Sequence, residues 1–338
     1  MNKYGIILIA GGVFIILLFS FLHYVPPKRD VITIIESEYM TKEGIIRDYG
    51  RKGDVKLLSE SLGLYMEYLL LRADQKRFHQ QFDVLMDHFL VRKGSDTFLK
   101  WELAKGVSTN ALVDDLRIID VLLRASETFH KPIYRETALK LFQTIQEKQK
   151  TSAGYVDFYD WHHEQRADTL HLSYLYVHLL TTLDPAMNSS DVYARFRERH
   201  ASLFYHEYYS YDTHTFKEEH KGEVNLIDQF LIELQLTSIG ERNEAFYQWV
   251  KSEMINEHKL YGRYTKDRRP KPAVSYESSA VYALGTQYFL DNHDEQMAKE
   301  FHQRLSKFQL QSQADYDSIH FFDFINYALA HWKYQHQE

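Results

Sequence analysis

A succession of helical patterns constrains the fold of this chain more than any other feature of its sequence. From Val31 onward, apolar residues recur at the three- and four-residue spacing of amphipathic helices, and Gly, Pro, Asn or Asp residues separate the segments. About twelve helices are predicted, over residues 31–47, 56–72, 75–92, 109–128, 132–147, 166–182, 191–202, 224–239, 242–257, 275–290, 293–309 and 321–335. No run shows the alternation of a half-buried strand, so the domain is expected to be all-α.

Helices in this number fit two kinds of all-α architecture. Helix hairpins can close into an (α/α)6 toroid, or they can stack into an open α-solenoid with the same local pattern. A solenoid uses short uniform turns and a fixed period. Here the segments between helices are uneven and rich in aromatic and charged residues, as at 98–102, 154–161, 205–212 and 260–264. The toroid is therefore the favoured prediction, with a solenoid scaffold as the alternative.

The first residues carry a separate constraint. Residues 4–22 form an apolar run without a charge, which as a helix would be about 28 Å long and could cross the hydrocarbon core of a bilayer. A cleaved signal peptide is the alternative, but no small-x-small cleavage site follows the run. We therefore predict a signal anchor with a short linker over residues 1–29, as a single N-terminal transmembrane helix, and one domain over residues 30–338. Lys3 before the run competes with Lys28 and Arg29 after it, so these charges leave the orientation open.

Composition excludes several classes of function. The chain has 338 residues, a net charge of -7 and no cysteine. The acidic balance argues against a dedicated nucleic-acid-binding protein. The missing cysteine excludes disulfides, thiolate metal sites, thiol nucleophiles and lipid attachment to cysteine. Among the 18 histidines there is no His-Glu-x-x-His motif, and His162, His163 and His206 lack a correctly spaced third partner. We expect neither a catalytic metal nor a cofactor.

Acidic residues stand near the predicted starts of three otherwise apolar helices. Glu60 follows Ser59, which is a predicted N-cap, while Asp114 and Asp115 form a pair in the second helix and Asp228 lies in the third. Such carboxylates can complement a helix dipole, pair with a cation, or act in catalysis. Glycoside hydrolysis needs two carboxyl groups, one protonated and one ionised. Because the sequence does not give their separation, inversion and retention both stay open at this point.

The order and spacing of these segments resemble glycoside hydrolase family 8. The matching segments are residues 59–66, 98–101, 111–118, 227–228 and 276–284, and the resemblance spans about residues 35–335. That family contains endoglucanases, xylanases, lichenases, chitosanases and the cellulases that accompany bacterial cellulose synthesis. The resemblance implies an (α/α)6 barrel, an inverting mechanism, and a domain held on the extracytoplasmic side of the cell membrane.

The resemblance also implies roles for individual residues. Glu60 matches the general acid of the family and Asp228 matches its general base. Asp115, or Asp114 if the register slips by one, matches a carboxylate that contacts the sugar next to the scissile bond. Trp101 matches an aromatic residue that stacks on a sugar ring. In the aromatic segment 154–161, where ring faces and acceptors suit a polyol ligand, Tyr155 and Tyr159 are further candidates for substrate contact.

The chain departs from the family pattern at four positions. Ser61 and Tyr65 stand where the family has glycine, Val113 stands where it has an aspartate, and Leu231 stands where it has an arginine. The last two changes remove polar contacts at the bond-breaking subsite, so the substrate is expected to differ from plain cellulose.

The sequence thus predicts a membrane-anchored, extracytoplasmic, endo-acting glycoside hydrolase. Its expected substrate is a polysaccharide, in particular a β-linked exopolysaccharide of the same bacterium, and the exopolysaccharide synthesis machinery is a further expected partner. The alternative is a catalytically degenerate polysaccharide-binding or synthase-accessory protein on the same fold, which the losses at Val113 and Leu231 favour.

Overall fold

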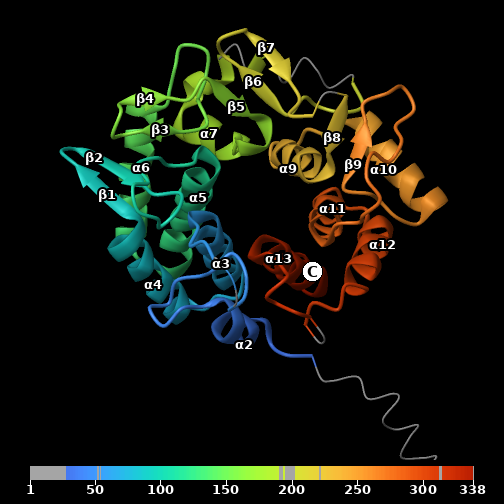
Figure 1. The fold of residues 1–338 in the computed structure, drawn as a ribbon, viewed down its shortest axis with the longest axis horizontal. Coiled ribbons are helices and arrows are strands. Elements are labelled where there is room, and N and C mark those ends of the chain that lie inside the picture. The colour runs from blue at the N-terminus through green and yellow to red at the C-terminus, as the bar shows by residue number, and fades with distance from the viewer. Residues whose placement is uncertain are drawn as a thin grey trace, which may run out of the picture.

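The chain forms a closed ring of helices in two layers (Figure 1). The structure is a computed structural model that describes residues 28–51, 53, 55–189, 193–194, 202–220, 222–311 and 314–337. The inner helices are α3 (Ser59–Leu71), α5 (Leu112–Phe129), α7 (Val177–Leu183), α9 (Leu226–Thr237), α11 (Ser279–Asp291) and α13 (Phe321–Gln335). The outer helices are α2 (Val31–Ile34), α4 (Gln75–Val84), α6 (Pro132–Lys148), α10 (Glu244–Glu257) and α12 (Glu295–Ser306). Because α13 packs against α3, the ring closes, which excludes the open α-solenoid.

The two layers differ in sequence pattern for a physical reason. The inner helices α3 and α11 are buried on nearly every side, and their residues are apolar nearly all round. The outer helices α4 and α12 bury one face and expose the other to water. The layers approach closely at Gly285 of α11, where an added Cβ atom would lie 2.2 Å from the ring of Phe301 of α12. Only glycine fits at that position without moving the phenylalanine.

Short strands occupy the connections that lead from an outer helix to the next inner helix. The strands of the described residues are β1 (Leu90–Lys93), β2 (Asp96–Leu99), β3 (Tyr159–Asp160), β4 (Gln165–Arg166), β5 (Thr169–His171), β6 (Tyr208–Ser210), β7 (Thr215–Lys217), β8 (Glu223–Asn225) and β9 (Arg263–Thr265). They pair antiparallel as β1-β2, β3-β4, β5-β6-β7 and β8-β9.

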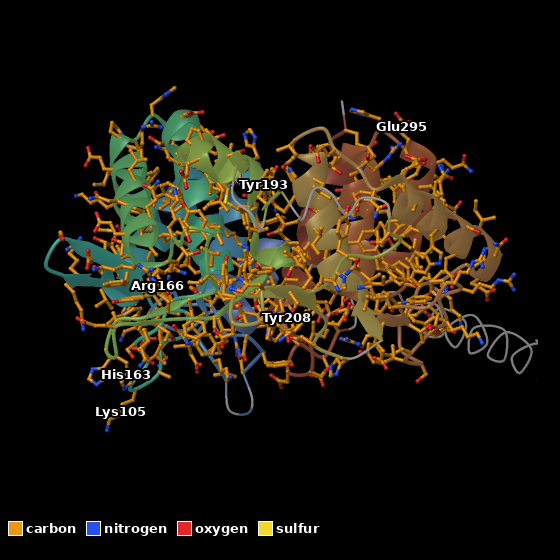
Figure 2. All side chains as sticks on the ribbon, turned by 90° about the horizontal axis from the view of Figure 1, so that it is seen from above. Lys105, His163, Arg166, Tyr193, Tyr208 and Glu295 are labelled. Atoms are coloured by element: carbon orange, nitrogen blue, oxygen red, sulfur yellow. The ribbon has the colours of Figure 1, made fainter. Side chains whose placement is uncertain are left out.

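The connections in the other direction are short, as between α3 and α4 and between α5 and α6. All of these strands therefore gather at the end of the ring where the inner helices begin. Figure 2 shows Lys105 and His163 at this end and Glu295, the first residue of α12, at the opposite end.

The strands correct the expectation of an all-α domain, although the protein is mostly helical. The helix predicted over residues 166–182 is wrong in its first half, which holds β5 and a 3-10 turn over Leu172–Tyr174, labelled η3. Asp157 explains the extended backbone there. Its carboxylate accepts hydrogen bonds from the backbone N–H of His171 at 2.7 Å and from Oγ1 of Thr169 at 2.6 Å.

Two of the predicted helices are shorter than their apolar patterns. The helix predicted over residues 31–47 ends in a π-helical turn, η1 (Ile35–Tyr39), and the helix predicted over residues 75–92 ends in a second one, η2 (Leu85–Phe89). The helix predicted over residues 321–335 is confirmed at both ends by α13. The predicted helix over residues 191–202 lies outside the described residues, apart from residues 193–194 and 202.

The predicted anchor over residues 4–22 also lies outside the described residues. Within the described ranges, none of the helices combines the length and the apolar character that a membrane crossing requires.

Candidate active site

Glu60 lies in the first turn of α3, at the strand-bearing end of the ring. The prediction of Ser59 as N-cap is wrong, because Ser59 is itself the first helical residue and the N-cap is Leu58. The Ser59 hydroxyl lies 3.0 Å from Oδ2 of Asp114 and 3.2 Å from the carbonyl oxygen of Trp101. Ser59 thus ties the start of α3 to α5 and to the loop that carries Trp101, and this holds Glu60 in place.

A buried ion pair stands beside Glu60. Nη1 of Arg117 donates to Oδ1 of Asp114 at 2.6 Å, and both side chains are buried. Gly63 of α3 makes room for the arginine, since an added Cβ atom would lie 3.2 Å from its Cδ atom. Burial and the charge of Asp114 raise the pKa of Glu60 to about 7, while Arg117 acts in the opposite direction. A carboxyl group with this pKa is half protonated at neutral pH, as a general acid requires.

Asp115 faces a different environment from Asp114. Its Oδ2 atom accepts a hydrogen bond of 2.5 Å from Asn110, which also donates to Gln149 at 2.5 Å and accepts from the backbone N–H of Tyr159. Burial raises the pKa of Asp115 well above its usual value. The resemblance left open whether Asp114 or Asp115 is the counterpart of the sugar-contacting carboxylate. The geometry favours Asp114, because its charge raises the pKa of Glu60. Asp115 instead belongs to the hydrogen-bond network of Asn110 and Gln149.

Asp228 occupies the corresponding position on the other side of the ring, in the first turn of α9 directly after β8. The side chain of Asn225 caps this helix by accepting a hydrogen bond from the backbone N–H of Ile227 at 3.0 Å. Burial raises the pKa of Asp228 to about 6, Glu207 adds to the rise, and Ser173 and His171 oppose it.

His171 and Asp157 form a pair next to Asp228. Nδ1 of His171 lies 2.8 Å from Oδ2 of Asp157, and the imidazole stacks on Tyr174 at 5.0 Å between ring centroids. Burial lowers the pKa of His171, but the hydrogen bond and charge of Asp157 outweigh it, so the pKa is raised. When His171 is protonated, its charge favours the ionised form of Asp228, which is the form that a general base needs.

The hydroxyl of Tyr174 responds to the charges of both candidate catalytic groups. Burial raises its pKa, and the charges of Asp157, Asp114, Asp228 and Glu60 each add to the rise. Charge interactions of this kind fall off with distance and are screened beyond roughly 10 Å. Tyr174 therefore lies within reach of the charges of Glu60, on the α3 wall of the ring, and of Asp228, on the α9 wall.

A cavity of about 370 Å³ opens beside these residues. Aromatic rings and hydrogen-bonding side chains share its wall, which is lined by Trp101, Thr109, Asn110, Ala111, Asp157, Phe158, Thr169, His171 and Tyr174. The side chain of Phe158 is 41% exposed, so its ring is available to a ligand. Ring faces for the C–H surface of a sugar and acceptors for its hydroxyls are the features of a carbohydrate site. The structure thus places Trp101 on the wall of this cavity.

Tyr155 and Tyr159, the other predicted contacts, lie away from the cavity. Tyr155 is fully buried, and its hydroxyl donates to Oδ2 of Asp184 at 2.8 Å. Tyr159 stacks on Phe98 at 5.8 Å in a small cluster that also contains Trp161. Both tyrosines therefore pack within the protein and do not line the cavity, so we no longer count them among the candidate site residues.

Sequence reasoning missed four residues of the site, which are Asp157, Phe158, His171 and Tyr174. Phe158 and Asp157 stand between the two predicted tyrosines in the same aromatic segment, so that segment was the correct signal and the choice of residue within it was wrong. His171 and Tyr174 were hidden in the helix that the sequence predicts over residues 166–182.

Comparisons with known proteins identify the family. No family model matches the chain. The chain is 29% identical over 295 residues to the putative lipoprotein YdaJ of Bacillus subtilis (strain 168), covering 84% of this chain and 78% of YdaJ. It is 33% identical to PssZ from Listeria monocytogenes, whose crystal structure matches with a TM-score of 0.80 over 92% of this chain and 99% of that chain. The chain therefore belongs to the same family as PssZ.

More distant solved structures share the fold. An α-amylase from Clostridium perfringens is 20% identical, with a TM-score of 0.79 over 90% of this chain and 96% of that chain. The endoglucanase Cel10 from Klebsiella pneumoniae, a family 8 glycosyl hydrolase, is 13% identical, with a TM-score of 0.63 over 91% of this chain and 99% of that chain. The ring is thus an (α/α)6 fold of the kind found in glycoside hydrolase family 8, which confirms the resemblance at the level of the fold.

Proposed function

We propose that this protein is an extracytoplasmic glycoside hydrolase that cleaves a polysaccharide within its chain, with inversion at the anomeric carbon. Glu60 donates its proton to the glycosidic oxygen as the bond from that oxygen to the anomeric carbon breaks. Asp228 takes a proton from the water whose oxygen attacks the same carbon from the opposite face. The step leaves Glu60 ionised and Asp228 protonated, and proton exchange with solvent restores both.

The observation that carries this proposal is the pair of buried carboxyl groups at the starts of α3 and α9, whose charges both act on the hydroxyl of Tyr174. Glu60 and Asp228 start two inner helices, and burial raises both pKa values, to about 7 for Glu60 and to about 6 for Asp228. The order of these values gives the proton to Glu60 and the negative charge to Asp228 near neutral pH. Two carboxyl groups held in opposite protonation states beside an aromatic cavity are what glycoside hydrolysis requires.

The substrate class follows from the same site and from the comparisons. The aromatic wall supports a sugar polymer, and endoglucanases with this fold support a β-linked one, such as an exopolysaccharide of the producing bacterium. The α-amylase has the same fold with a higher TM-score. An α-linked glucan therefore belongs among the substrates to test.

The location follows from the N-terminal sequence. YdaJ is described as a putative lipoprotein, but this chain contains no cysteine to carry a lipid. In this proposal the apolar run over residues 4–22 takes the place of a lipid and tethers the domain outside the membrane, close to the machinery that makes the polysaccharide.

The test is the release of reducing ends by a soluble form that begins at residue 28. Suitable substrates are β-1,4-glucan, chitosan, xylan, starch and an exopolysaccharide extract. Glu60→Gln and Asp228→Asn keep the side-chain shapes, and each should lower turnover at least about a hundredfold while sugar binding persists. Glu67→Gln is the matched control, because Glu67 lies two turns further along the same helix, away from the end of the ring that carries Glu60. Full activity in the Glu60→Gln or Asp228→Asn variant would overturn the assignment.

A second candidate is a polysaccharide-binding protein that has kept the ring and lost the chemistry. Its support is the ion pair between Asp114 and Arg117, which occupies a carboxylate that acts on Glu60, together with the changes at Val113 and Leu231. Binding of a polysaccharide without release of reducing ends from any substrate would favour this candidate over the hydrolase.

A further inference from the structure

A hairpin beside the helix that carries Asp228 presents a cluster of exposed positive charges. β9 pairs antiparallel with β8, and β8 leads directly into α9. Because the two strands are antiparallel, β9 runs away from the start of α9, and residues 266–271 form a turn farther from that helix. The chain returns along the other edge of β9, where Pro272 forms a bridge with Tyr264. We refer to residues 263–273 as the basic hairpin.

The positive charges of the basic hairpin are of two kinds. Near its base, Arg263 is paired with a carboxylate of β8 at 3.2 Å, and Lys266 is paired with Glu218. In the turn, Asp267 is the single acidic residue. The turn contains three exposed cations that form no ion pair within the described part of the chain, namely Arg268, Arg269 and Lys271. These charges are therefore available to a partner outside the molecule.

Hydrogen bonds and prolines hold the turn in shape. The backbone N–H of Thr265 donates to the carbonyl oxygen of Lys271 at 2.9 Å, and the Thr265 hydroxyl accepts a hydrogen bond from the N–H of Lys271 at 3.1 Å. Pro270 and Pro272 fix the backbone φ angle on either side of Lys271. A turn that is ordered beforehand loses less conformational entropy when it binds, so its cations are suited to recognition.

An exposed aromatic ring lies at the base of the basic hairpin. Tyr276 is 56% exposed, yet its ring is held against the backbone, because an added Cβ atom at Gly262 would lie 2.5 Å from it. The N–H of Gly262 donates to the carbonyl oxygen of Tyr276 at 3.1 Å, and the carbonyl oxygen of Gly262 accepts from the N–H of Leu226 at 3.0 Å. Leu226 is the first residue of α9, two residues before Asp228. The ring is therefore fixed near the candidate base, with a surface on which a sugar can stack.

The position of Tyr276 in the ring complements the cavity that Trp101 lines. That cavity is formed by residues that precede α5 and α7, whereas Tyr276 and the basic hairpin precede α11. Figure 1 shows α11 across the ring from α5. An enzyme that cleaves a polymer within its chain must hold the polymer on both sides of the broken bond. The cavity is suited to one side, and Tyr276 with the basic hairpin is suited to the other.

We propose that Tyr276 and the turn of the basic hairpin bind the polysaccharide beyond Asp228, and that this polysaccharide carries negatively charged substituents. A guanidinium group forms paired hydrogen bonds with a carboxylate or a phosphate, so Arg268 and Arg269 can recognise either group. The carboxylates of the catalytic site repel a negative charge at the bond that breaks. The charged sugars therefore lie farther along the polymer, beside the turn, while the sugars at the bond are uncharged.

This inference rests on the proposal that the ring binds a polysaccharide, but it does not require that the polysaccharide is cleaved. An anionic membrane surface is the alternative partner for exposed cations. The polysaccharide is favoured because Gly262 joins the exposed ring of Tyr276 to the start of α9, which places the basic hairpin next to the catalytic site.

The experiment is isothermal titration of the full chain in detergent micelles, as the Glu60→Gln variant so that the polymer stays intact. The probes are three soluble cellulose derivatives with one backbone, namely carboxymethylcellulose, cellulose phosphate and the neutral hydroxyethylcellulose. At low salt a charged derivative should bind at least about fivefold more tightly than the neutral one. Stronger binding of only one charged derivative identifies the substituent, and either outcome supports the proposal.

Variants in this background locate the bound charge. Replacing both Arg268 and Arg269 by Gln should raise the Kd of the charged derivative about five- to tenfold at low salt, and the effect should largely disappear in about 1 M salt. The matched control replaces Arg135 and Lys140 of the outer helix α6 by Gln. Both of these side chains are exposed and form no ion pair among the described residues, so this control removes the same charge and should leave the Kd unchanged.

Tyr276→Ala tests the aromatic part of the same surface. It should raise the Kd of the charged and neutral derivatives alike by a few fold, and this loss should persist in about 1 M salt, because stacking is not screened by ions. If the wild type releases no reducing ends while these binding differences hold, the hydrolase proposal fails and the polysaccharide site of the basic hairpin stands.

Two results would overturn the inference. The first is that neither charged derivative binds more tightly than hydroxyethylcellulose. The second is that the variant without Arg268 and Arg269 binds the charged derivatives as tightly as the α6 control does, which is what a role at the membrane surface predicts.

Discussion

The two walls of the central site hold the same chemical group in different surroundings. Glu60 stands among carboxylates, with Asp114 and Asp323 raising its pKa and the single cation Arg117 opposing them. Asp228 also has carboxylates near it, Glu207 and Glu219, but the hydroxyl of Ser173 and the imidazole of His171 favour its ionised form. Burial is the largest cause of both rises, from 4.5 to about 7 for the pKa of Glu60 and from 3.8 to about 6 for that of Asp228, so the ordinary difference between glutamate and aspartate accounts for much of their separation.

This difference teaches how one fold assigns two roles to two carboxyl groups. Both groups lie in the first turn of an inner helix, so the helix termini cannot tell them apart. What differs is the set of side chains around each group, such as Asp114 on α5 for Glu60 and His171 at the end of β5 for Asp228. A change to one of these neighbours should therefore alter the pKa of the carboxyl group beside it and leave the pKa of the other unchanged.

The largest effect is expected at the Glu60 wall from Arg117→Met. This change leaves Asp114 buried without its cation, so the free energy of unfolding should fall by about 3–5 kcal/mol. Urea unfolding measures the loss. Arg124→Met is the matched control on the same helix, since the side chain of Arg124 is 42% exposed and its ion pair with Glu67 should contribute about 1 kcal/mol or less. Equal losses in the two variants would contradict the view that the Arg117 pair is specially placed.

An intermediate effect is expected in the pH dependence of kcat/KM. Activity should be highest between pH 6 and 7, fall below pH 6 as Asp228 gains a proton, and fall above pH 7 as Glu60 loses one. Each unit beyond these limits should cost about tenfold. His171→Gln removes a charge that lowers the pKa of Asp228, so the acidic limb should move to higher pH while the alkaline limb stays in place. Movement of the alkaline limb instead would show that the two walls are not independent.

The smallest effect on activity is expected from the aromatic wall of the cavity. Phe158→Ala removes an exposed ring, so KM should rise a few fold with little change in thermal stability, because stacking of this kind contributes about 0.5–1.5 kcal/mol. Tyr155→Phe should do the reverse, lowering stability by about 1 kcal/mol through its lost bond to Asp184 and leaving KM unchanged. A change in KM for the Tyr155 variant would instead show that Tyr155 contributes to substrate binding.

The fold could be predicted where burial follows the helical period. The helix at residues 321–335 is confirmed at both ends, because its apolar positions follow the period of a helix packed inside the ring. The helix predicted over residues 166–182 is wrong in its first half because of a contact with a residue earlier in the chain. Its leucines and valine have a helical spacing, but Asp157 binds the backbone of His171 and the side chain of Thr169 and holds that stretch extended.

The candidate site divides in the same way. The positions of Glu60 and Asp228 at helix starts could be predicted, since a carboxylate that interrupts an apolar run is visible in the sequence. The rise in both pKa values could not, because the burial of Glu60 and Asp228 and their contact with Asp114 and His171 arise only in the folded ring. The choice of Phe158 over Tyr155 and Tyr159 also depends on which side of the loop faces the cavity, and composition carries no information about that.

The measurement that tests the assignment of roles most directly compares two leaving groups. An oligosaccharide that the wild type cleaves is prepared as an aryl glycoside with a weakly basic phenol, which departs without protonation, and is compared with the natural linkage. The Glu60→Gln variant should regain most of its activity on the aryl glycoside, because that substrate needs no general acid. The Asp228→Asn variant should stay inactive on both, because the attacking water still lacks its base. Recovery in Asp228→Asn with continued inactivity in Glu60→Gln would contradict the account and exchange the two roles.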